Sequence, residues 1–237
     1  MSSQTFGWSI RQAASKLRDH LEARRVCRSA LANGINIEEG HLGGYIRADD
    51  RPTPSGLDVA HGDPATYSPK LWRWAQERFG VRSVLDVGCG EGHAARFFAD
   101  LGCEVLGVDG SPMAKADSVI PDCHNLHDYT TGPLVLDRQF DLLWSCEFVE
   151  HVEERYVPNF MATFQACRGH VMLTYAEPGQ IGWHHVNCQP ASYWIEKMLI
   201  AGFRYDDDLT HTSRTIAEEG HYQARGLMFR READGSK

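Results

Sequence analysis

The stretch VLDVGCGEGHAARFFADLGCEVLGVDGSP, which runs from Val84 to Pro112, decides the fold of this chain. It opens with a short apolar segment, passes through three closely spaced glycines, and continues with apolar residues at helical spacing. A second apolar segment closes it. This order predicts a strand, a sharp turn, a helix and a second strand parallel to the first. Each strand carries an acid, with Asp86 near the end of the first and Asp109 at the end of the second.

The glycine pattern indicates what the turn binds. Gly88, Gly90 and Gly92 form G-x-G-x-G, in which the missing side chains let the backbone turn sharply and approach a ligand closely. The acid Asp109 can accept hydrogen bonds from both ribose hydroxyls of a nucleoside. A dinucleotide-binding turn needs G-x-G-x-x-G, and His93 stands where its third glycine belongs. No G-K-[ST] follows, so a phosphate-binding P-loop is excluded.

The G-x-G-x-G turn, with Asp86 before it and Asp109 after it, resembles motif I and the following acidic position of class I S-adenosylmethionine-dependent methyltransferases. The resemblance implies S-adenosylmethionine as the cofactor and S-adenosylhomocysteine as its product. It also implies an α/β fold, a Rossmann-like, seven-stranded, mostly parallel sheet with helices on both faces. A tight turn without a ligand and a dinucleotide oxidoreductase are the alternatives.

The resemblance also implies roles for residues at the carboxyl edge of the sheet. Asp109 would bind the ribose hydroxyls, Asp86 the amino group of the methionine moiety, and Asp128 the adenine amino group. Gly110 and Ser111 would flank the adenine. The full set of expected cofactor contacts is Tyr67, Asp86, Gly88, Cys89, Gly90, Gly92, Asp109, Gly110, Ser111, Asp128 and Cys146.

The rest of the chain alternates between expected strands and helices, which is typical of an α/β sheet covered on both faces. A helix is expected to start at Ser68-Pro69, run through Phe79 and stop at Gly80. Further strands are expected within 119–129, at Phe140–Cys146 and at Val171–Tyr175, and helices at PMAKADS, over 157–167 and over 191–201. Residues 203–210 and 223–231 are expected to form the antiparallel strand pair that ends such a fold.

The N-terminal third is predicted to be an extension of one catalytic domain. Residues 1–80 are expected to form a helical and loop extension that acts as a lid or cap, and residues 81–237 the S-adenosylmethionine-binding domain. Apolar spacing predicts a helix over about 8–32, with six Lys or Arg residues between Arg11 and Arg28. Glycine and proline interrupt residues 35–68, which predicts a long loop.

Candidate catalytic residues follow the fourth and fifth expected strands. The segment SCEFVEHVEE contains Glu150 and His151, which could orient a substrate or transfer a proton. The loop EPGQIGWHHVNCQP contains His184 and His185. His185 is the first choice for a general base because histidine titrates near neutral pH and this loop faces the ligand crevice. No metal is expected, since H-E-x-x-H is absent and adjacent histidines in an extended chain point in opposite directions.

The segment HVNCQPASYWIEKMLIAGF resembles a narrower set of bacterial and phage methyltransferases, several of them found with sugar or cell-surface glycan genes. Cys188 stands where their pattern has glutamate. This resemblance implies O-methylation of a small polar acceptor such as a sugar or glycan precursor. The absence of N-P-P-[YF] favours oxygen over nitrogen as the methylated atom. The alternatives are an RNA or protein methyltransferase that docks through the basic N-terminal helix, and a non-catalytic S-adenosylmethionine-binding partner subunit.

Bulk properties favour a cytoplasmic enzyme. The net charge of −8 gives no general attraction for nucleic acid, so a small-molecule acceptor is favoured. No stretch approaches the ~20 apolar residues that span a bilayer, and the N-terminus lacks the pattern of a secretory signal. The seven cysteines include no C-x-x-C pair, which predicts reduced thiols without a structural zinc.

Overall fold

The structure is a computed structural model that describes residues 51–52, 58–59, 63–180, 182 and 184–232. The predicted helix over 8–32 and most of the predicted loop over 35–68 lie outside these residues. The division of the chain at residue 80 therefore stays a prediction. Among the described residues, no helix has the length and apolar character needed to cross a membrane.

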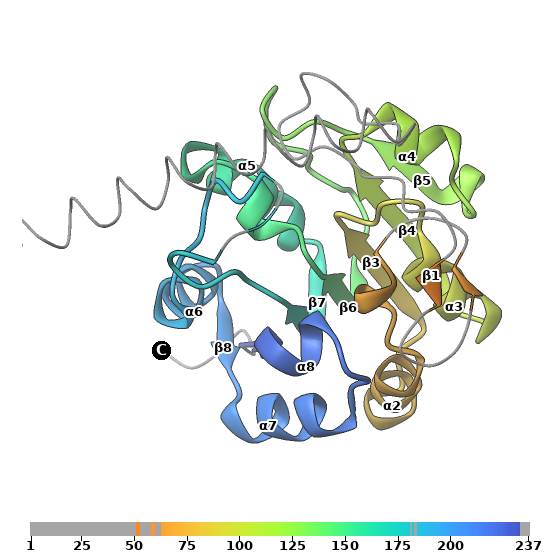
Figure 1. The fold of residues 1–237 in the computed structure, drawn as a ribbon. Coiled ribbons are helices and arrows are strands. Elements are labelled where there is room, and N and C mark those ends of the chain that lie inside the picture. The colour runs from red at the N-terminus through yellow and green to blue at the C-terminus, as the bar shows by residue number, and fades with distance from the viewer. Residues whose placement is uncertain (1–50, 53–57, 60–62, 181, 183, 233–237) are drawn as a thin grey trace, which may run out of the picture.

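A seven-stranded sheet forms the centre of the molecule, in the order β5-β4-β3-β6-β7-β9-β8 (Figure 1). The strands are β3 (Ser83–Val87), β4 (Glu104–Asp109), β5 (His124–Leu126), β6 (Phe140–Ser145), β7 (Cys167–Leu173), β8 (Phe203–Tyr205) and β9 (Leu227–Arg231). The first five in the sheet order are parallel, and β9 runs antiparallel to both β7 and β8. The predicted mostly parallel, Rossmann-like sheet is confirmed. A short antiparallel pair, β1 (Arg51–Pro52) and β2 (Asp58–Val59), precedes it.

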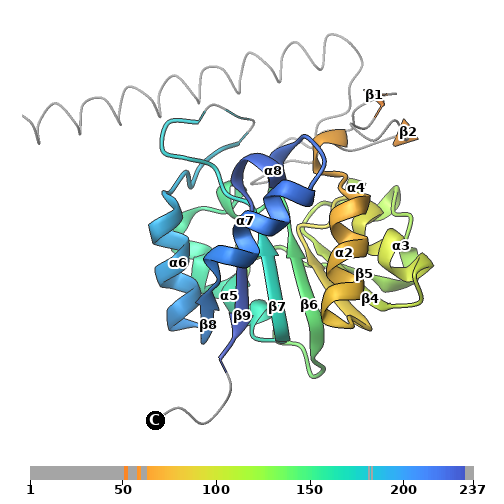
Figure 2. The same ribbon diagram turned by 90° about the horizontal axis from the view of Figure 1, so that it is seen from below.

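Helices cover both faces of the sheet, as Figures 1 and 2 show. On one face lie α5 (Val157–Phe164) and α6 (Ala191–Ile200). On the other lie α2 (Pro69–Phe79), α3 (His93–Asp100), α7 (Asp207–Ile216) and α8 (His221–Arg225). Strand residues alternate between the two cores, because successive side chains of a strand point to opposite faces. The short helix α4 (Pro112–Ala116) lies beside β5.

Three predicted boundaries were wrong. The predicted strand over 223–231 begins at Leu227, because His221–Arg225 form the helix α8. Strand β7 begins at Cys167, inside the predicted helix over 157–167, and Gly169 allows this because a β-carbon there would collide with the backbone oxygen of Asp141. The predicted strand over 203–210 ends at Tyr205, since Asp206 caps α7 by accepting a hydrogen bond from the Leu209 amide at 3.0 Å. The three consecutive acids from Asp206 are a helix-start signal that the strand prediction overlooked.

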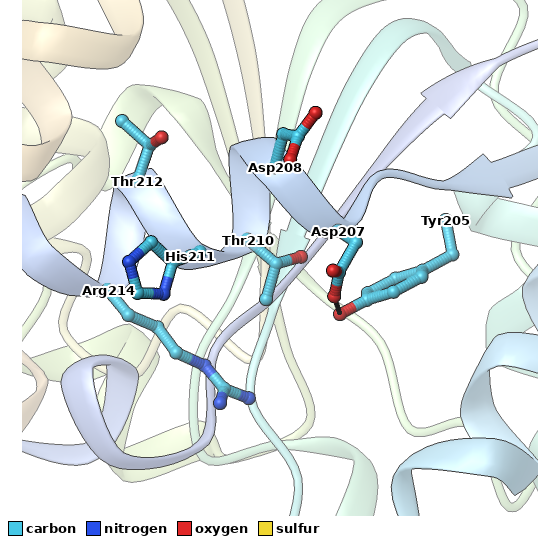
Figure 3. A pocket seen from close by; sticks show the side chains of 7 residues that line it. All are labelled: Tyr205, Asp207, Asp208, Thr210, His211, Thr212 and Arg214. Carbon is cyan, nitrogen blue, oxygen red and sulfur yellow. Dashed lines mark hydrogen bonds between the residues drawn. The ribbon is translucent and has the colours of Figure 1, made fainter.

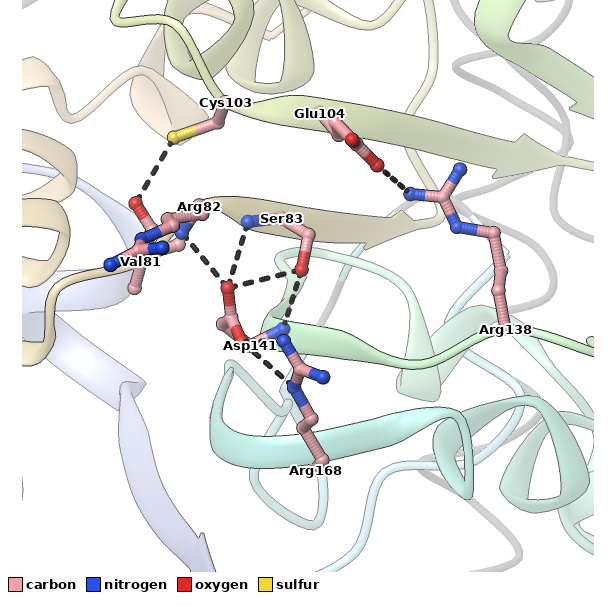
Figure 4. Close-up of polar contacts among 8 residues, drawn as sticks. All are labelled: Val81, Arg82, Ser83, Cys103, Glu104, Arg138, Asp141 and Arg168. Carbon is pink, nitrogen blue, oxygen red and sulfur yellow. Dashed lines mark hydrogen bonds and ion pairs between the residues drawn. The ribbon is translucent and has the colours of Figure 1, made fainter.

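Polar contacts at the amino edge of the sheet hold three strands in register (Figure 4). Asp141 accepts hydrogen bonds from the backbone amides of Arg82 at 2.9 Å and Ser83 at 3.0 Å. Its other oxygen accepts from the Arg168 guanidinium at 2.7 Å. This carboxylate therefore ties the starts of β3, β6 and β7 together, and the carboxyl ends of these strands meet at the opposite edge.

Candidate functional site

A glycine turn connects β3 to α3 at the carboxyl edge of the sheet. Gly88, Gly90 and Gly92 have φ values of 77°, 53° and 88°, a region that side chains disfavour. A β-carbon on Gly88 would lie 2.6 Å from the Phe148 β-carbon, and one on Gly92 would collide with Ile120. The turn therefore requires glycine for both its backbone conformation and its close packing.

The two predicted acids flank this turn. Asp109 accepts hydrogen bonds from the backbone amides of Gly90 and Ser111, both at 2.8 Å. A carboxylate accepts about four hydrogen bonds, so ordering the turn is compatible with binding a ribose. Asp86 is buried and accepts from the Ala95 amide at 3.2 Å. Burial raises the pKa of Asp86 to about 7, against the effect of the Ala95 hydrogen bond. A cationic group beside Asp86 would relieve this cost.

Three further predicted cofactor residues lie in the turns that follow β4 and β5. Gly110 connects Asp109 to Ser111, whose hydroxyl caps α4 by accepting from the Ala114 amide at 3.1 Å. Asp128 accepts from the Thr130 amide at 2.8 Å and so stabilises its own turn. The side chains of Ser111 and Asp128 therefore each have a local structural role. That these residues and Gly110 contact a cofactor stays a prediction.

The last three predicted contacts lie on separate segments. Tyr67 packs edge-on against Trp72 of α2, with ring centroids 4.9 Å apart. The Cys89 sulfur lies 3.8 Å from the His124 Nε2 atom. Cys146 is buried directly after β6. Cofactor contacts of these residues also stay predictions.

A second group of side chains lies after β6, the strand beside β3. Oxygen or nitrogen atoms of Glu147, Glu150, His151 and His185 all lie within 4.8 Å of one another. We call these four residues the Glu–His cluster. Glu150 and His151 belong to the 3₁₀ turn Val149–His151, whereas His185 comes from the loop between β7 and α6. The sequence predicts a catalytic role for three of the four, and the fold brings those three together.

Backbone contacts explain why the distant loop reaches the cluster. The amides of Val186 and Asn187 donate hydrogen bonds to the Glu150 carbonyl oxygen at 2.9 and 3.0 Å. The His185 ring lies over Gly182, where a β-carbon would collide with it. The rings of His151 and His185 then meet edge to face, with centroids 5.0 Å apart. His184, the other histidine of this loop, is not a member of the cluster.

Burial dominates the electrostatics of the cluster. Glu150 is 0% exposed, and neither of its carboxylate oxygens makes a hydrogen bond of good geometry to the described residues. Burial raises the pKa of Glu150 well above its usual range, and the Glu147 carboxylate raises it further. Burial also lowers the pKa of His151 to about 3, and His185 adds to this shift. An ionised Glu150 thus needs a positive partner at this position.

Two residues in or next to the cluster have strained backbone conformations. Glu147 and His184, with φ values of 52° and 48°, are the non-glycine residues with positive φ in the described part of the chain. Such conformations cost about 1–3 kcal/mol each and persist where the surrounding structure imposes them. At Glu147 the backbone amide donates to the Thr174 hydroxyl at 2.8 Å, which holds the strained residue in place.

The sequence interpretation missed two members of this region. Glu147 lies three positions before Glu150, a spacing visible in the sequence that was not used. His221 of α8 lies 3.4 Å from Glu147 and 2.8 Å from Asp63, and these ionic contacts raise its pKa although burial lowers it. No local pattern connects His221 to the cluster, because only the fold brings α8 to the end of β6.

A surface hollow beside α7 is a separate feature (Figure 3). Its lining residues are Tyr205, Asp207, Asp208, Thr210, His211, Thr212 and Arg214. None of them belongs to the glycine turn or to the Glu–His cluster. Tyr205 and Asp207 are already hydrogen-bonded to each other at 3.0 Å. The hollow is therefore not part of the candidate site.

Comparisons with known proteins agree with this geometry. Residues 59–218 match the model of a family described as a methyltransferase domain. A ubiquinone biosynthesis O-methyltransferase from Pseudomonas fluorescens is 29% identical over 139 residues, which are 53% of this chain and 54% of that protein. The chain thus spans about half the length of this curated relative.

Two solved structures share the fold. A sugar N-methyltransferase from a Streptoalloteichus species aligns with a TM-score of 0.52 at 16% identity, covering 69% of this chain and 85% of that one. A TehB-like S-adenosylmethionine-dependent methyltransferase from Corynebacterium glutamicum aligns with a TM-score of 0.50 at 16% identity, covering 69% and 88%. At this level of identity the likeness shows the fold.

Proposed function

The chain belongs to the methyltransferase domain family, and we propose that it transfers a methyl group from S-adenosylmethionine to a hydroxyl oxygen of a small polar acceptor, such as a sugar or glycan precursor. The observation that carries this proposal is the position of the Glu–His cluster at the end of β6, beside the glycine turn at the end of β3. Strands β3 and β6 are paired neighbours, with Asp86 opposite Trp144. The two sites therefore lie next to each other.

The glycine turn fits the family's cofactor. Gly88 and Gly92 let Phe148 and Ile120 pack directly against the turn, where a β-carbon would collide with them. Asp109 would bind the ribose hydroxyls, and the buried Asp86 would face the cationic amino group. When bound, S-adenosylmethionine supplies an electrophilic methyl group attached to a sulfonium sulfur. The chain must then hold the acceptor oxygen in line with this methyl group and exclude water.

The Glu–His cluster supplies the groups that handle the acceptor hydroxyl. Phe148 lies between Glu147 and Glu150 in sequence and packs directly on Gly88, so it connects the cluster to the cofactor turn. An acceptor bound over the cluster would place its hydroxyl near carboxylate and imidazole groups. These groups would orient the hydroxyl and take its proton as the new carbon–oxygen bond forms, with His185 as the preferred base.

Three observations support a hydroxyl oxygen as the methylated atom or a small molecule as the acceptor. The curated relative is named as an O-methyltransferase. The net charge of −8 disfavours general binding to nucleic acid. The segment that contains His185 resembles methyltransferases associated with sugars and glycans. These are independent arguments for one substrate class.

Methyl transfer to defined acceptors tests the proposal. The purified chain would be incubated with methyl-labelled S-adenosylmethionine and three pools: nucleotide sugars with other small hydroxyl compounds, total RNA, and protein. We expect label in the small-molecule pool, in a product that resists alkali as an ether does. Label confined to RNA or protein would overturn the acceptor class. Binding of S-adenosylmethionine without transfer to any pool would overturn the catalytic role.

A further inference from the structure

The Glu–His cluster has the donor set of a metal site. It combines two carboxylates with two imidazoles, which come from the turn after β6 and from the loop before α6. Ligands that lie 2.0–2.2 Å from one ion are at most about 4.4 Å from one another. The donors here lie within 4.8 Å of one another, so their widest separation exceeds that limit by no more than a few tenths of an ångström.

Glu150 gives an independent reason to place a cation there. Its carboxylate is fully buried, and neither oxygen makes a hydrogen bond of good geometry to the described residues. An unpaired charge in this position is costly unless a cation or a proton neutralises it. The Nδ1 atom of His151 is likewise buried without a hydrogen bond to the described residues. Both unsatisfied groups belong to the same cluster.

The surroundings of the cluster resemble the outer shell of a metal site. Ligating side chains are usually held by further polar partners that fix their orientation. His221 contacts Glu147 at 3.4 Å and is itself held by Asp63 at 2.8 Å. The Glu150 backbone is fixed by the amides of Val186 and Asn187. The candidate ligands are therefore positioned from several elements.

We propose that Glu147, Glu150, His151 and His185 bind one divalent metal ion. Two carboxylates balance the charge of such an ion. Mixed oxygen and imidazole ligands favour Mn²⁺, Co²⁺ or Zn²⁺ over Mg²⁺, which prefers oxygen donors and retains its waters. This inference differs from the sequence-based expectation of no metal, which considered only the local spacing of histidines.

The consequence for catalysis rests on the proposed function. A bound divalent ion would orient an acceptor hydroxyl and lower its pKa. With the ion bound, His185 would be a ligand and no longer the general base, and the more acidic hydroxyl would lose its proton to solvent before the methyl group is transferred. The metal site itself does not depend on the identity of the acceptor.

Binding of Mn²⁺ tests the site without any substrate. Tag-free protein, treated with a chelator and desalted, would be titrated with Mn²⁺ while the electron paramagnetic resonance signal of free Mn²⁺ is recorded. We expect saturable binding that Glu150→Gln weakens by more than the ~10–100-fold typical of an outer-shell change. The matched controls are His211→Asn and Glu219→Gln, whose exposed side chains lie outside the cluster. Both should bind Mn²⁺ as the wild type does.

Thermal unfolding separates loss of the site from loss of the fold. We expect Glu150→Gln without metal to be at least as stable as the wild type, because glutamine has nearly the shape of the buried glutamate and carries no charge that burial would penalise. Mn²⁺ should then raise the unfolding temperature of the wild type and of the two control variants, but not that of Glu150→Gln. If Glu150→Gln does not fold, Glu147→Gln replaces it in the titration. Equal Mn²⁺ binding by wild type and cluster variants would overturn the metal site, whatever methyl transfer shows.

Discussion

Gly88 lies directly against Phe148, so closely that a β-carbon on Gly88 would be 2.6 Å from the Phe148 β-carbon. This contact joins the turn after β3 to the turn after β6. A side-chain tip can rotate away from such a clash, but a β-carbon moves only with its backbone. The cofactor turn and the Glu–His cluster are therefore coupled through one contact.

Substituting Gly88 should cost more stability than substituting another glycine with a similar backbone. Gly80 also has a positive φ, 61°, but its β-carbon would meet nothing within 4 Å. We expect Gly80→Ala to lose about 1–2 kcal/mol, the usual cost of this conformation for alanine. Gly88→Ala should lose more and should also weaken binding of S-adenosylhomocysteine. Urea unfolding and calorimetry measure both, and equal losses in the two variants would contradict the coupling.

Cofactor binding should release a proton from Asp86. Burial raises the pKa of this carboxyl to about 7, and a cationic amino group would lower it on binding. Affinity for S-adenosylmethionine should thus rise with pH toward neutrality, while Asp86→Asn should lack this part of the dependence. Calorimetry at about pH 6.5 in two buffers of different ionisation enthalpy measures the proton count. An identical proton count in wild type and Asp86→Asn would contradict the role of Asp86.

The Asp86 carboxyl should also make the stability of the cofactor-free protein depend on pH. Because its pKa is raised in the folded state, the folded state binds the proton more tightly than the unfolded chain does. The contribution of Asp86 to stability therefore falls as pH rises from about 4 to about 7. Asp86→Asn should flatten this fall in urea unfolding across that range. A difference between variant and wild type that is independent of pH would argue against a buried, titrating Asp86.

Replacing Asp141 should destabilise the fold more than replacing its exposed partner Arg168. Partial burial would raise its pKa, but hydrogen bonds from the Arg82 amide and the Arg168 side chain hold it below the usual value. Asp141→Ala should lose about 1–3 kcal/mol because two backbone donors lose their acceptor, whereas Arg168→Ala should lose about 0–1 kcal/mol. The Asp141→Ala deficit should shrink as pH falls below about 4, when the wild-type carboxylate is protonated. Equal deficits at neutral pH would refute this account.

His221 should act as a positioning residue for Glu147. We expect His221→Ala to weaken Mn²⁺ binding by about 10–100-fold, as outer-shell changes do, and His221→Gln to recover part of the loss. Affinity for S-adenosylhomocysteine should not change, because His221 contacts Asp63 and Glu147 and not the glycine turn. Parallel losses of both affinities would point to a general structural defect instead.

Much of the fold could be predicted because its signals are local. Short apolar segments locate β3 and β4, apolar residues at helical spacing locate α3, and glycine is required where the chain turns between β3 and α3. The start of β7 could not be located this way, since the need for Gly169 comes from the Asp141 backbone on a neighbouring strand. The end of β8 could have been found, because three successive acids mark a helix start.

The candidate site also has one part that the sequence predicts and another that depends on contacts between distant segments. The glycine turn and its two acids lie within one β-α-β unit, so the sequence places them together. Glu150, His151 and His185 were each identifiable, but their convergence depends on the hydrogen bonds from Val186 and Asn187 to Glu150. His221 reaches the cluster from another helix, and no spacing in the sequence encodes that contact.

Calorimetric titration of S-adenosylhomocysteine into the wild type and Asp109→Asn tests the central claim most directly. We predict saturable binding by the wild type, weaker binding by the correctly folded variant, and no binding of a nicotinamide dinucleotide to either. Tight binding of the dinucleotide, with no heat from S-adenosylhomocysteine, would contradict the account.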